Sequence, residues 1–362
     1  MNDKVKKLIR PEIQALSAYH VADASGLIKL DAMENPYGWP DDMVSDWLAR
    51  LKSAELNRYP DPEAKALVKA LRRNIGLSNN MELMLGNGSD ELIQIVLMSV
   101  ASHDRVVMAP SPTFVMYDMI ARFTAMQYVG VPLKEDFSLD MDAMLSAIKQ
   151  YQPAVIFLAW PNNPTGNLFD KSDVEAIIKA SSGLVIVDEA YHAFCGDSFV
   201  PELAHYDNLL VMRTLSKTGL AGLRLGMLMG APEWITEFNK VRLPYNINIL
   251  SQASAGFALE HTEVLDAQAQ SLREERETLS QQLQSINGVT VYPSKANFIL
   301  FRTPDGKADN IHQVLKEKGV LIKNLNGSNP ALKNCLRVTV GKPEENECFI
   351  NALQEVLVPS GS

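Results

Sequence analysis

The chain has 362 residues, of which 46% are hydrophobic and 21% charged, a composition typical of a globular protein large enough for about two domains. Its formal net charge of −9 argues against a nucleic-acid-binding protein, although a local group of basic side chains can still bind a small anion. The three cysteines are widely separated and the histidines show no metal-ligand spacing, so we expect neither a disulfide framework nor a metal site. We expect a cytoplasmic protein that is not a membrane protein, because no apolar run reaches membrane-spanning length and the first residues lack the apolar core of a signal peptide.

The hydrophobic pattern of the first two thirds of the chain predicts an α/β fold. Residues 1–40 are expected to form an extended arm with a short helical start, followed by helices at 41–51 and 63–74. Seven apolar runs then indicate buried strands, and most of them are separated by segments with helical spacing. Strands without polar alternation, separated by helices, are typical of a mostly parallel sheet covered on both faces. The strands are expected at 81–85, 105–109, 125–129, 154–159, 183–187, 209–213 and 225–229.

After residue 244 the pattern changes to fewer elements in a different order. One long helical region is expected at about 249–283, and it is followed by a mixture of shorter strands and helices. This order predicts a smaller α+β domain. We therefore expect three parts: an arm with part of the small domain at 1–40, a large α/β domain at 41–248, and the rest of the small domain at 249–362.

Polar or glycine-rich clusters follow five of the predicted strands, and ligands collect at the carboxyl ends of parallel strands. The first cluster is Gly86-Asn-Gly-Ser-Asp-Glu91, which leads into a helix whose free amide groups could bind a phosphate. The alternative is an ordinary turn in which Ser89 or Asp90 caps the helix. After the second strand, Phe114 could stack on a flat heterocycle, although an aromatic residue at this place is more often part of the core.

Two further strand ends carry groups that suit a pyridine ring. The loop Ala159-Trp-Pro-Asn-Asn-Pro-Thr-Gly166 is stiffened by prolines and presents Asn163, whose amide could donate to a phenolate oxygen. The segment Val185-Ile-Val-Asp-Glu-Ala-Tyr191 places Asp188 at the end of a buried strand. This carboxylate could pair with a protonated ring nitrogen, or it could be a helix cap or a surface acid. Tyr191 could bind the same phenolate oxygen as Asn163.

The stretch from Thr214 to Gly226 carries the lysine on which the interpretation depends. Lys217 lies just past an apolar run in a glycine-rich setting, where desolvation favours the neutral amine that can form an imine. Two hydroxyls, of Thr214 and Ser216, and the guanidinium of Arg224 could hold a phosphate around the same turn. A lysine and a phosphate anchor are what pyridoxal phosphate requires. Taken alone, this stretch could also be a solvated loop after a strand.

Four motifs, in this order, resemble those of the fold-type I pyridoxal-phosphate aminotransferases. They are Asn87-Gly-Ser89, Asn163-Pro-Thr-Gly166, Asp188-Glu-Ala-Tyr191 and Ser216-Lys-Thr-Gly-Leu-Ala-Gly-Leu-Arg224. Within that group the chain is most similar to the histidinol-phosphate aminotransferases, over essentially its whole length. The resemblance implies a large domain with a mostly parallel seven-stranded sheet between helices, a smaller α+β domain, and pyridoxal 5′-phosphate as the cofactor.

The resemblance also implies a role for each matching position. Lys217 would bond covalently to the cofactor and move the proton during the reaction. Asp188 would pair with the ring nitrogen, Asn163 and Tyr191 would contact the phenolate oxygen, and Phe114 would stack on the ring. The cofactor phosphate would be held by residues at the helix start and in the lysine turn, namely Gly88, Ser89, Thr214, Ser216 and Arg224, and Asp90 is a further cofactor-binding candidate.

Other matching positions concern the substrate and a second subunit. Tyr59 matches a tyrosine that reaches the cofactor phosphate of the neighbouring subunit, which implies a homodimer. Arg337 matches an arginine that binds the substrate carboxylate or, in a phospho-amino alcohol, the phosphate-bearing end. Asn35 and Tyr19 are further candidates for contact with the substrate.

Two departures from the family pattern bear on the site. The turn from Lys217 to Arg224 is one residue shorter than in many aminotransferases, and Gly219 and Gly222 could absorb the difference. Lys323 stands where several relatives have an arginine, and a lysine lacks the planar fork of donors. A structure that separated Arg224 from Lys217 would contradict the interpretation.

The reaction that the resemblance implies is transamination. L-glutamate would give its amino group to imidazole-acetol phosphate, forming 2-oxoglutarate and L-histidinol phosphate in histidine biosynthesis. An aromatic amino-acid aminotransferase and a phospho-threonine decarboxylase are the alternatives on a related scaffold. A non-catalytic regulator of transcription that binds pyridoxal phosphate would need a DNA-binding module, and the first 40 residues are too few and not basic enough for one.

Overall fold

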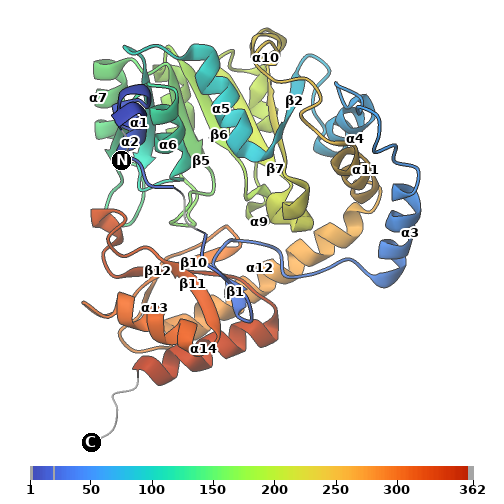
Figure 1. Ribbon diagram of the computed structural model, residues 1–362. Coiled ribbons are helices and arrows are strands. Elements are labelled where there is room, and N and C mark those ends of the chain that lie inside the picture. The colour runs from blue at the N-terminus through green and yellow to red at the C-terminus, as the bar shows by residue number, and fades with distance from the viewer. Residues whose placement is uncertain (1–2, 19–20, 358–362) are drawn as a thin grey trace, which may run out of the picture.

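A seven-stranded sheet forms the centre of the larger part of the protein (Figure 1). The structure is a computed structural model and describes residues 3–18 and 21–357. All of the strands run in the same direction except β8, which is antiparallel to both of its neighbours, so the predicted seven-stranded, mostly parallel sheet is confirmed. The strand order is β2 (Glu82–Asn87), β8 (Leu225–Gly230), β7 (Leu209–Thr214), β6 (Leu184–Asp188), β5 (Val155–Ala159), β3 (Val106–Ser111) and β4 (Gln127–Pro132).

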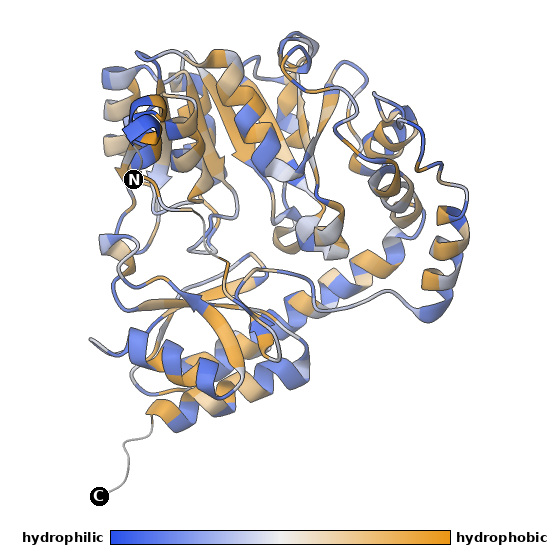
Figure 2. Ribbon diagram, viewed as in Figure 1, coloured by the Kyte–Doolittle hydropathy of each residue, from blue (hydrophilic) through white to orange (hydrophobic). Residues whose placement is uncertain are grey.

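Helices cover both faces of this sheet, as the continuous apolar strands predict. Alternate residues of one strand point into different cores: Phe157 packs with the core under α5 and α6, whereas Ile156 and Leu158 pack with the core under α7 and α8. Figure 2 shows hydrophobic residues along the strands and hydrophilic residues on the outer sides of the helices. The helices of one face are α5 (Gly88–Val100), α6 (Met116–Phe123) and α10 (Pro232–Asn239), and those of the other include α4 (Lys65–Ile75), α7 (Met141–Tyr151) and α8 (Lys171–Ala180).

A second, five-stranded sheet is built from the two ends of the chain. Its order is β1 (Ile28–Leu30), β11 (Val320–Asn324), β12 (Cys335–Thr339), β10 (Phe298–Arg302) and β9 (Thr290–Val291). Residues of α12 (Thr262–Gln284), α13 (Ala308–Glu317) and α14 (Pro343–Leu357) share one hydrophobic core with it. The arm thus contributes a strand, β1, that pairs in parallel with β11, in addition to the short helices α1 (Asp3–Leu8) and α2 (Pro11–Gln14).

The prediction of a single helix at about 249–283 is wrong, because the chain forms two helices there. The first, α11 (Ile249–Ala258), packs against α3 (Asp41–Leu51) and α4 beside the larger sheet. The second, α12, begins after a break at 259–261 and runs toward the five-stranded sheet (Figure 1). The division of the chain at residues 41 and 249 remains a prediction. Over the described residues, none of the helices combines the length and the apolar character needed to cross a bilayer.

Candidate active site

The ends of five strands of the larger sheet meet at one cavity. Its wall contains most of the residues that the sequence singles out for cofactor binding, although they come from widely separated parts of the chain. Two lining residues, Met33 and Ala190, are not among those predicted. The lining residues are Met33, Ser89, Asp90, Phe114, Asn163, Asp188, Ala190, Tyr191, Thr214, Ser216, Lys217 and Arg224.

One end of the cavity is formed by the start of α5. The helix begins at Gly88, and no side chain caps it, so the alternative in which Ser89 or Asp90 serves as the cap is not what the structure shows. Glu91 instead folds back, and its Oε2 accepts a hydrogen bond from the backbone N–H of Asn87 at 2.7 Å. The amide groups of the first helical turn have no partner within the helix and are a ready site for an anion.

The donors around this helix start suit a phosphate. A Cβ atom at Gly88, where φ is +78°, would lie 2.6 Å from Nη2 of Arg224, so glycine alone lets the guanidinium approach the turn. Nη1 of Arg224 donates to Oγ of Ser216 at 3.3 Å, and Thr214 Oγ1 donates to the same oxygen at 2.9 Å. Nη2 of Arg224 pairs with Asp90 at 3.4 Å. Hydroxyls, a guanidinium and a helix start are together the donor set that a phosphate needs, and the residues therefore fit that part of the cofactor.

The shorter turn between Lys217 and Arg224 does not separate them. The chain leaves β7 through a π-turn, Ser216–Leu220, in which Gly219 has φ of +100°, and through a 3₁₀ turn at Ala221–Leu223. Arg224 itself takes a left-handed backbone conformation, with φ of +51°. This irregular path turns both side chains into the same cavity, and π-turns often mark functional sites. The departure from the family spacing therefore leaves the predicted site intact.

Lys217 forms part of the cavity wall. Its Nζ donates to the backbone oxygen of Ala32 at 3.2 Å and lies 5.8 Å from the centre of the Tyr191 ring. Burial, followed by the positive charge of Arg337, lowers the pKa of Lys217 to about 8. A lysine in this state is partly neutral at physiological pH, as a nucleophilic amine must be.

Asp188 ends β6, lines the cavity and is buried. Its Oδ1 accepts from the backbone N–H of Ala190 at 3.1 Å, and its Oδ2 accepts from the hydroxyl of Tyr117 at 2.7 Å. Burial raises the pKa of Asp188 to about 6, while these two hydrogen bonds work in the other direction. Sequence reasoning missed Tyr117, which lies on α6, three residues after Phe114.

Asn163 links the cavity to the five-stranded sheet. Its Nδ2 donates to the hydroxyl of Tyr191 at 3.2 Å, and its Oδ1 accepts from Nη1 of Arg337 at 2.5 Å. Arg337 lies on β12 and also donates to the backbone oxygen of Asp31 at 2.9 Å. Lys323 is the direct cross-strand neighbour of Arg337. The arginine predicted for the substrate thus adjoins the residues predicted for the phenolate oxygen.

Two other predicted residues, Asn35 and Tyr59, lie outside the cavity wall. Asn35 does not line the cavity, because its Nδ2 donates to Oε1 of Gln268 at 2.9 Å behind the lysine turn. Tyr59 is 81% exposed and stacks on Tyr245 with 4.5 Å between ring centres, outside the cavity of its own chain. Tyr19 falls outside the described residues.

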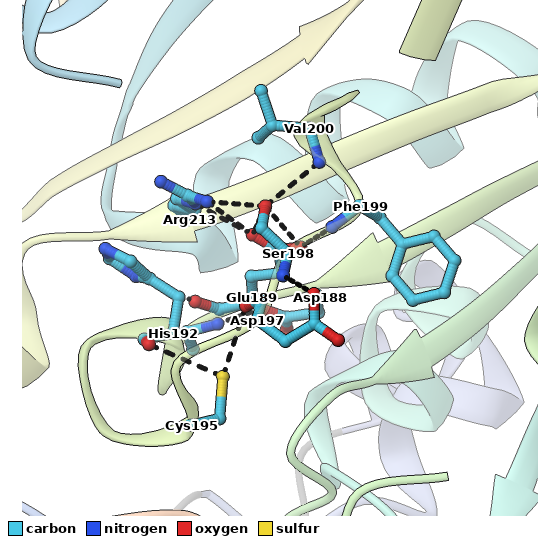
Figure 3. A network of polar contacts seen from close by, with 10 residues as sticks. Asp188, Glu189, His192, Cys195, Asp197, Ser198, Phe199, Val200 and Arg213 are labelled. Carbon is cyan, nitrogen blue, oxygen red and sulfur yellow. Dashed lines mark hydrogen bonds and ion pairs between the residues drawn. The ribbon is translucent and has the colours of Figure 1, made fainter. Parts of the chain in front are cut away.

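A buried polar network fixes the segment that follows Asp188 (Figure 3). Glu189 is fully buried and accepts from Nε of Arg213 at 2.8 Å, from Oγ of Ser198 at 3.0 Å and from the N–H of Phe199 at 2.5 Å. Removing one partner from such a pair leaves an uncompensated charge, which costs about 3–5 kcal/mol. The network holds the chain on both sides of α9 (His192–Cys195), and thereby Tyr191 at the cavity. No sequence motif pointed to it.

Comparison with known proteins assigns the chain to a family. The family model for class I and II aminotransferases matches residues 25–353. The chain belongs to that family. This aminotransferase is 60% identical to histidinol-phosphate aminotransferase 2 of Nitrosococcus oceani over 97% of the chain and 98% of that protein, and 51% identical to histidinol-phosphate aminotransferase 2 of Cupriavidus pinatubonensis over 96% of each.

The fold is also that of a solved aminotransferase. The histidinol-phosphate aminotransferase of Sinorhizobium meliloti, solved in complex with pyridoxal 5′-phosphate, has a TM-score of 0.85 at 23% identity, covering 96% of this chain and 97% of that one. The family confirms the predicted fold type, the predicted aminotransferase and pyridoxal phosphate as its cofactor. The roles of the individual site residues remain predictions.

The lowered pKa of Lys217 predicts how attachment of the cofactor depends on pH. A pKa of about 8 in place of the ordinary 10.5 gives about 300-fold more neutral amine at pH 7. When pyridoxal phosphate is added to the cofactor-free protein, we expect the visible band of the lysine adduct to form about tenfold faster at pH 9 than at pH 7, with a plateau above the pKa. A rate that still rose tenfold per pH unit beyond pH 9 would indicate an unperturbed lysine.

Proposed function

We propose that this aminotransferase transfers the amino group of L-glutamate to imidazole-acetol phosphate, forming 2-oxoglutarate and L-histidinol phosphate. The observation that carries the proposal is the 60% and 51% identity with histidinol-phosphate aminotransferases over nearly the whole chain. It is joined by a cavity that contains Lys217, Asp188 and the phosphate donors. We further propose that it works in the cytoplasm, whose reducing conditions suit the free thiols of Cys195, Cys335 and Cys348.

The residues of the cavity divide the work of holding the cofactor. When bound, pyridoxal phosphate supplies an electron sink for the negative charge that develops at the substrate Cα. The start of α5, Ser216 and Arg224 would hold its phosphate, and Asp188 would keep its ring nitrogen protonated. Asn163 and the hydroxyl of Tyr191 would donate to its phenolate oxygen. Phe114 would cover one face of the ring.

Lys217 would serve as the proton carrier of the reaction. Its Nζ would be the group that holds the cofactor covalently. Because the pKa of Lys217 is about 8, its amine, when free, would accept the proton from the substrate Cα near neutral pH and carry it as the ammonium. The carbonyl of Ala32, which lies 3.2 Å from Nζ, would orient the ammonium while it carries the proton.

Arg337 would select and orient both substrates. Its Nη1 contacts Oδ1 of Asn163, the residue proposed for the phenolate oxygen, so its guanidinium would be close to a group carried by the substrate Cα. In L-glutamate that substituent is a carboxylate, and in L-histidinol phosphate it is the phosphate-bearing arm. A guanidinium can bind either anion through two parallel hydrogen bonds. We propose that Arg337 binds the two in turn, with Lys323 on the neighbouring strand adding positive charge.

We also propose that the active unit is a homodimer with shared sites. Apolar side chains are exposed around Tyr59: Leu56 is 72%, Leu243 73% and Tyr245 40% exposed. A group of exposed apolar residues of this kind is typical of an interface. Since Tyr59 lies outside the cavity of its own chain, a second copy is the natural place for its hydroxyl to meet a cofactor phosphate.

Mixed dimers test this sharing. We expect Lys217→Ala to be inactive and Tyr59→Ala to bind the cofactor about tenfold more weakly, because a hydrogen bond to a phosphate is lost. When equal amounts of the two variants exchange subunits, half of the dimers are mixed, and each mixed dimer has one intact site. The mixed dimers should then contribute about a quarter of the wild-type activity, measured at a cofactor concentration at which the sites of Tyr59→Ala homodimers are largely empty. Lys217→Ala mixed with the double variant Lys217→Ala/Tyr59→Ala provides the control, because no intact site can form.

The substrate proposal is tested by the products. Purified holoenzyme is given L-glutamate with imidazole-acetol phosphate or with an aromatic keto acid, and separately O-phospho-threonine. We expect 2-oxoglutarate to form fastest with imidazole-acetol phosphate. Absence of amino transfer to this acceptor would overturn the proposal, and release of carbon dioxide from O-phospho-threonine would favour a decarboxylase instead.

A further inference from the structure

We propose that Tyr117 is a positioning residue of the cofactor site, whose hydroxyl fixes the Asp188 carboxylate for the ring nitrogen and whose ring supports Phe114. The inference rests on pyridoxal phosphate as the cofactor, and it holds whichever acceptor the enzyme uses. Tyr117 lies on α6 behind the cavity wall and contacts two wall residues from different elements.

The ring of Tyr117 has little freedom to move. The side chain is fully buried, and its ring is stacked on Phe157 of β5, with 4.5 Å between ring centres and planes only 7° apart. The rings of Tyr117 and Phe114 meet edge to face, with 5.5 Å between ring centres and 87° between the ring planes. Aromatic pairs in both arrangements are favourable. The sheet on one side and the predicted stacking residue on the other therefore hold the hydroxyl in one place.

The hydroxyl lies 2.7 Å from Oδ2 of Asp188, and the charges around it decide the direction of the bond. Burial raises the pKa of Tyr117 well above its ordinary value, so the phenol keeps its proton. The pKa of Asp188, about 6, leaves the carboxylate ionised at neutral pH. Tyr117 is therefore the donor and Asp188 the acceptor.

The hydroxyl of Tyr117 is a neutral donor, so it leaves the negative charge of Asp188 in place, which a cation would not do. Asp188 accepts hydrogen bonds from Tyr117 and from the backbone of Ala190, and in the part of the chain that the structure describes no lysine, arginine or histidine forms an ion pair with it. An arginine in place of Tyr117 would satisfy the negative charge. The phenol supports the carboxylate without neutralising it, so a protonated pyridine nitrogen would be its counter-charge.

Tyr117→Phe removes the hydroxyl and keeps both ring contacts. Without this donor the carboxylate competes more strongly for the proton of the ring nitrogen, and the bound cofactor becomes less cationic. We expect the dissociation constant of pyridoxal phosphate to rise about tenfold, and the pH midpoint of the bound cofactor's visible absorbance to move upward by about one unit. We expect kcat to fall by at least about tenfold while the KM for L-glutamate changes less than twofold.

Tyr128→Phe is the matched control, because Tyr128 packs in the same core and its hydroxyl does not bond to Asp188. It should leave the dissociation constant, the midpoint and kcat at their wild-type values. A second test uses Asp188→Asn, in which Tyr117→Phe should have little further effect, since neighbouring residues that act through one contact are not additive. This comparison separates positioning from a loss of packing.

A wild-type dissociation constant and midpoint in Tyr117→Phe would overturn the proposal, and so would full additivity with Asp188→Asn. These readouts do not involve the acceptor. An enzyme that fails to aminate imidazole-acetol phosphate but shows the expected changes would therefore overturn the proposed substrate and support the role of Tyr117. A wild-type protein that binds no pyridoxal phosphate would overturn both.

Discussion

Replacement of Lys217 by alanine should lower the rate of transamination by at least about 10⁴-fold, because one amine both bonds to the cofactor and carries the Cα proton. The variant should still bind pyridoxal phosphate, since the phosphate donors and Asp188 are unchanged. After treatment with borohydride, we expect a stable cofactor adduct in the wild-type protein and none in Lys217→Ala. Stopped-flow absorbance and mass spectrometry of the reduced proteins measure the two effects.

The control for this experiment is Lys240→Ala, which removes an exposed lysine that forms an ion pair with Glu237. It should retain both activity and the reducible adduct. An adduct that persists in Lys217→Ala would show that another lysine bonds to the cofactor, and the assignment of the whole β7–β8 connection would then be wrong.

Replacement of Arg337 by alanine should raise the KM for L-glutamate by about 100-fold, the effect of losing a charged pair that binds a buried anion. The same variant should bind L-histidinol phosphate more weakly by a similar factor, because we propose that one guanidinium serves both substrates. For both substrates, Arg337→Lys should bind less tightly than the wild type and more tightly than Arg337→Ala, since an ammonium cannot make the paired hydrogen bonds of a guanidinium. Each half-reaction is followed separately from the absorbance of the bound cofactor.

Arg302→Ala is a suitable comparison for Arg337. Arg302 lies on the neighbouring strand β10, but its Nη2 donates to the backbone of Ala331 and it does not line the cavity. Its replacement should affect stability more than the KM of either substrate. If Arg337→Ala binds only one of the substrates more weakly, the arginine serves that substrate alone. Wild-type binding of both substrates would show that Arg337 has no role in binding them.

The sequence was most informative where a buried strand ends. A strand such as Leu184–Asp188 is entirely apolar until its last residue, so a carboxylate at that end has to face a partner. The same reasoning applied to Asn163 and to the lysine turn, and the structure brings these residues to one cavity. These predictions needed only local information, because a strand end lies beside the ends of its parallel neighbours.

Contacts between segments far apart in the chain could not be predicted from the sequence. The strand Ile28–Leu30 is too short for a periodic pattern, and its partner Val320–Asn324 lies almost 300 residues away. Met33 lines the cavity because its backbone is held by Thr339 and Asn297, which lie near the other end of the chain. The prediction that Asn35 meets the substrate depended on resemblance alone; in the structure its side chain donates to Gln268, and its role at the substrate stays a prediction.

The placement of the two arginines has a consequence for how such an enzyme can change. Arg224 shares the β7–β8 connection with Lys217, whereas Arg337 and Lys323 stand side by side on β12 and β11 of the other sheet. Given the proposed roles of Arg337 and Arg224, mutations on β11 and β12 would alter which amino donor or acceptor is accepted while the cofactor anchor is inherited unchanged. Recognition of new substrates could evolve on one sheet at little risk to the chemistry performed on the other.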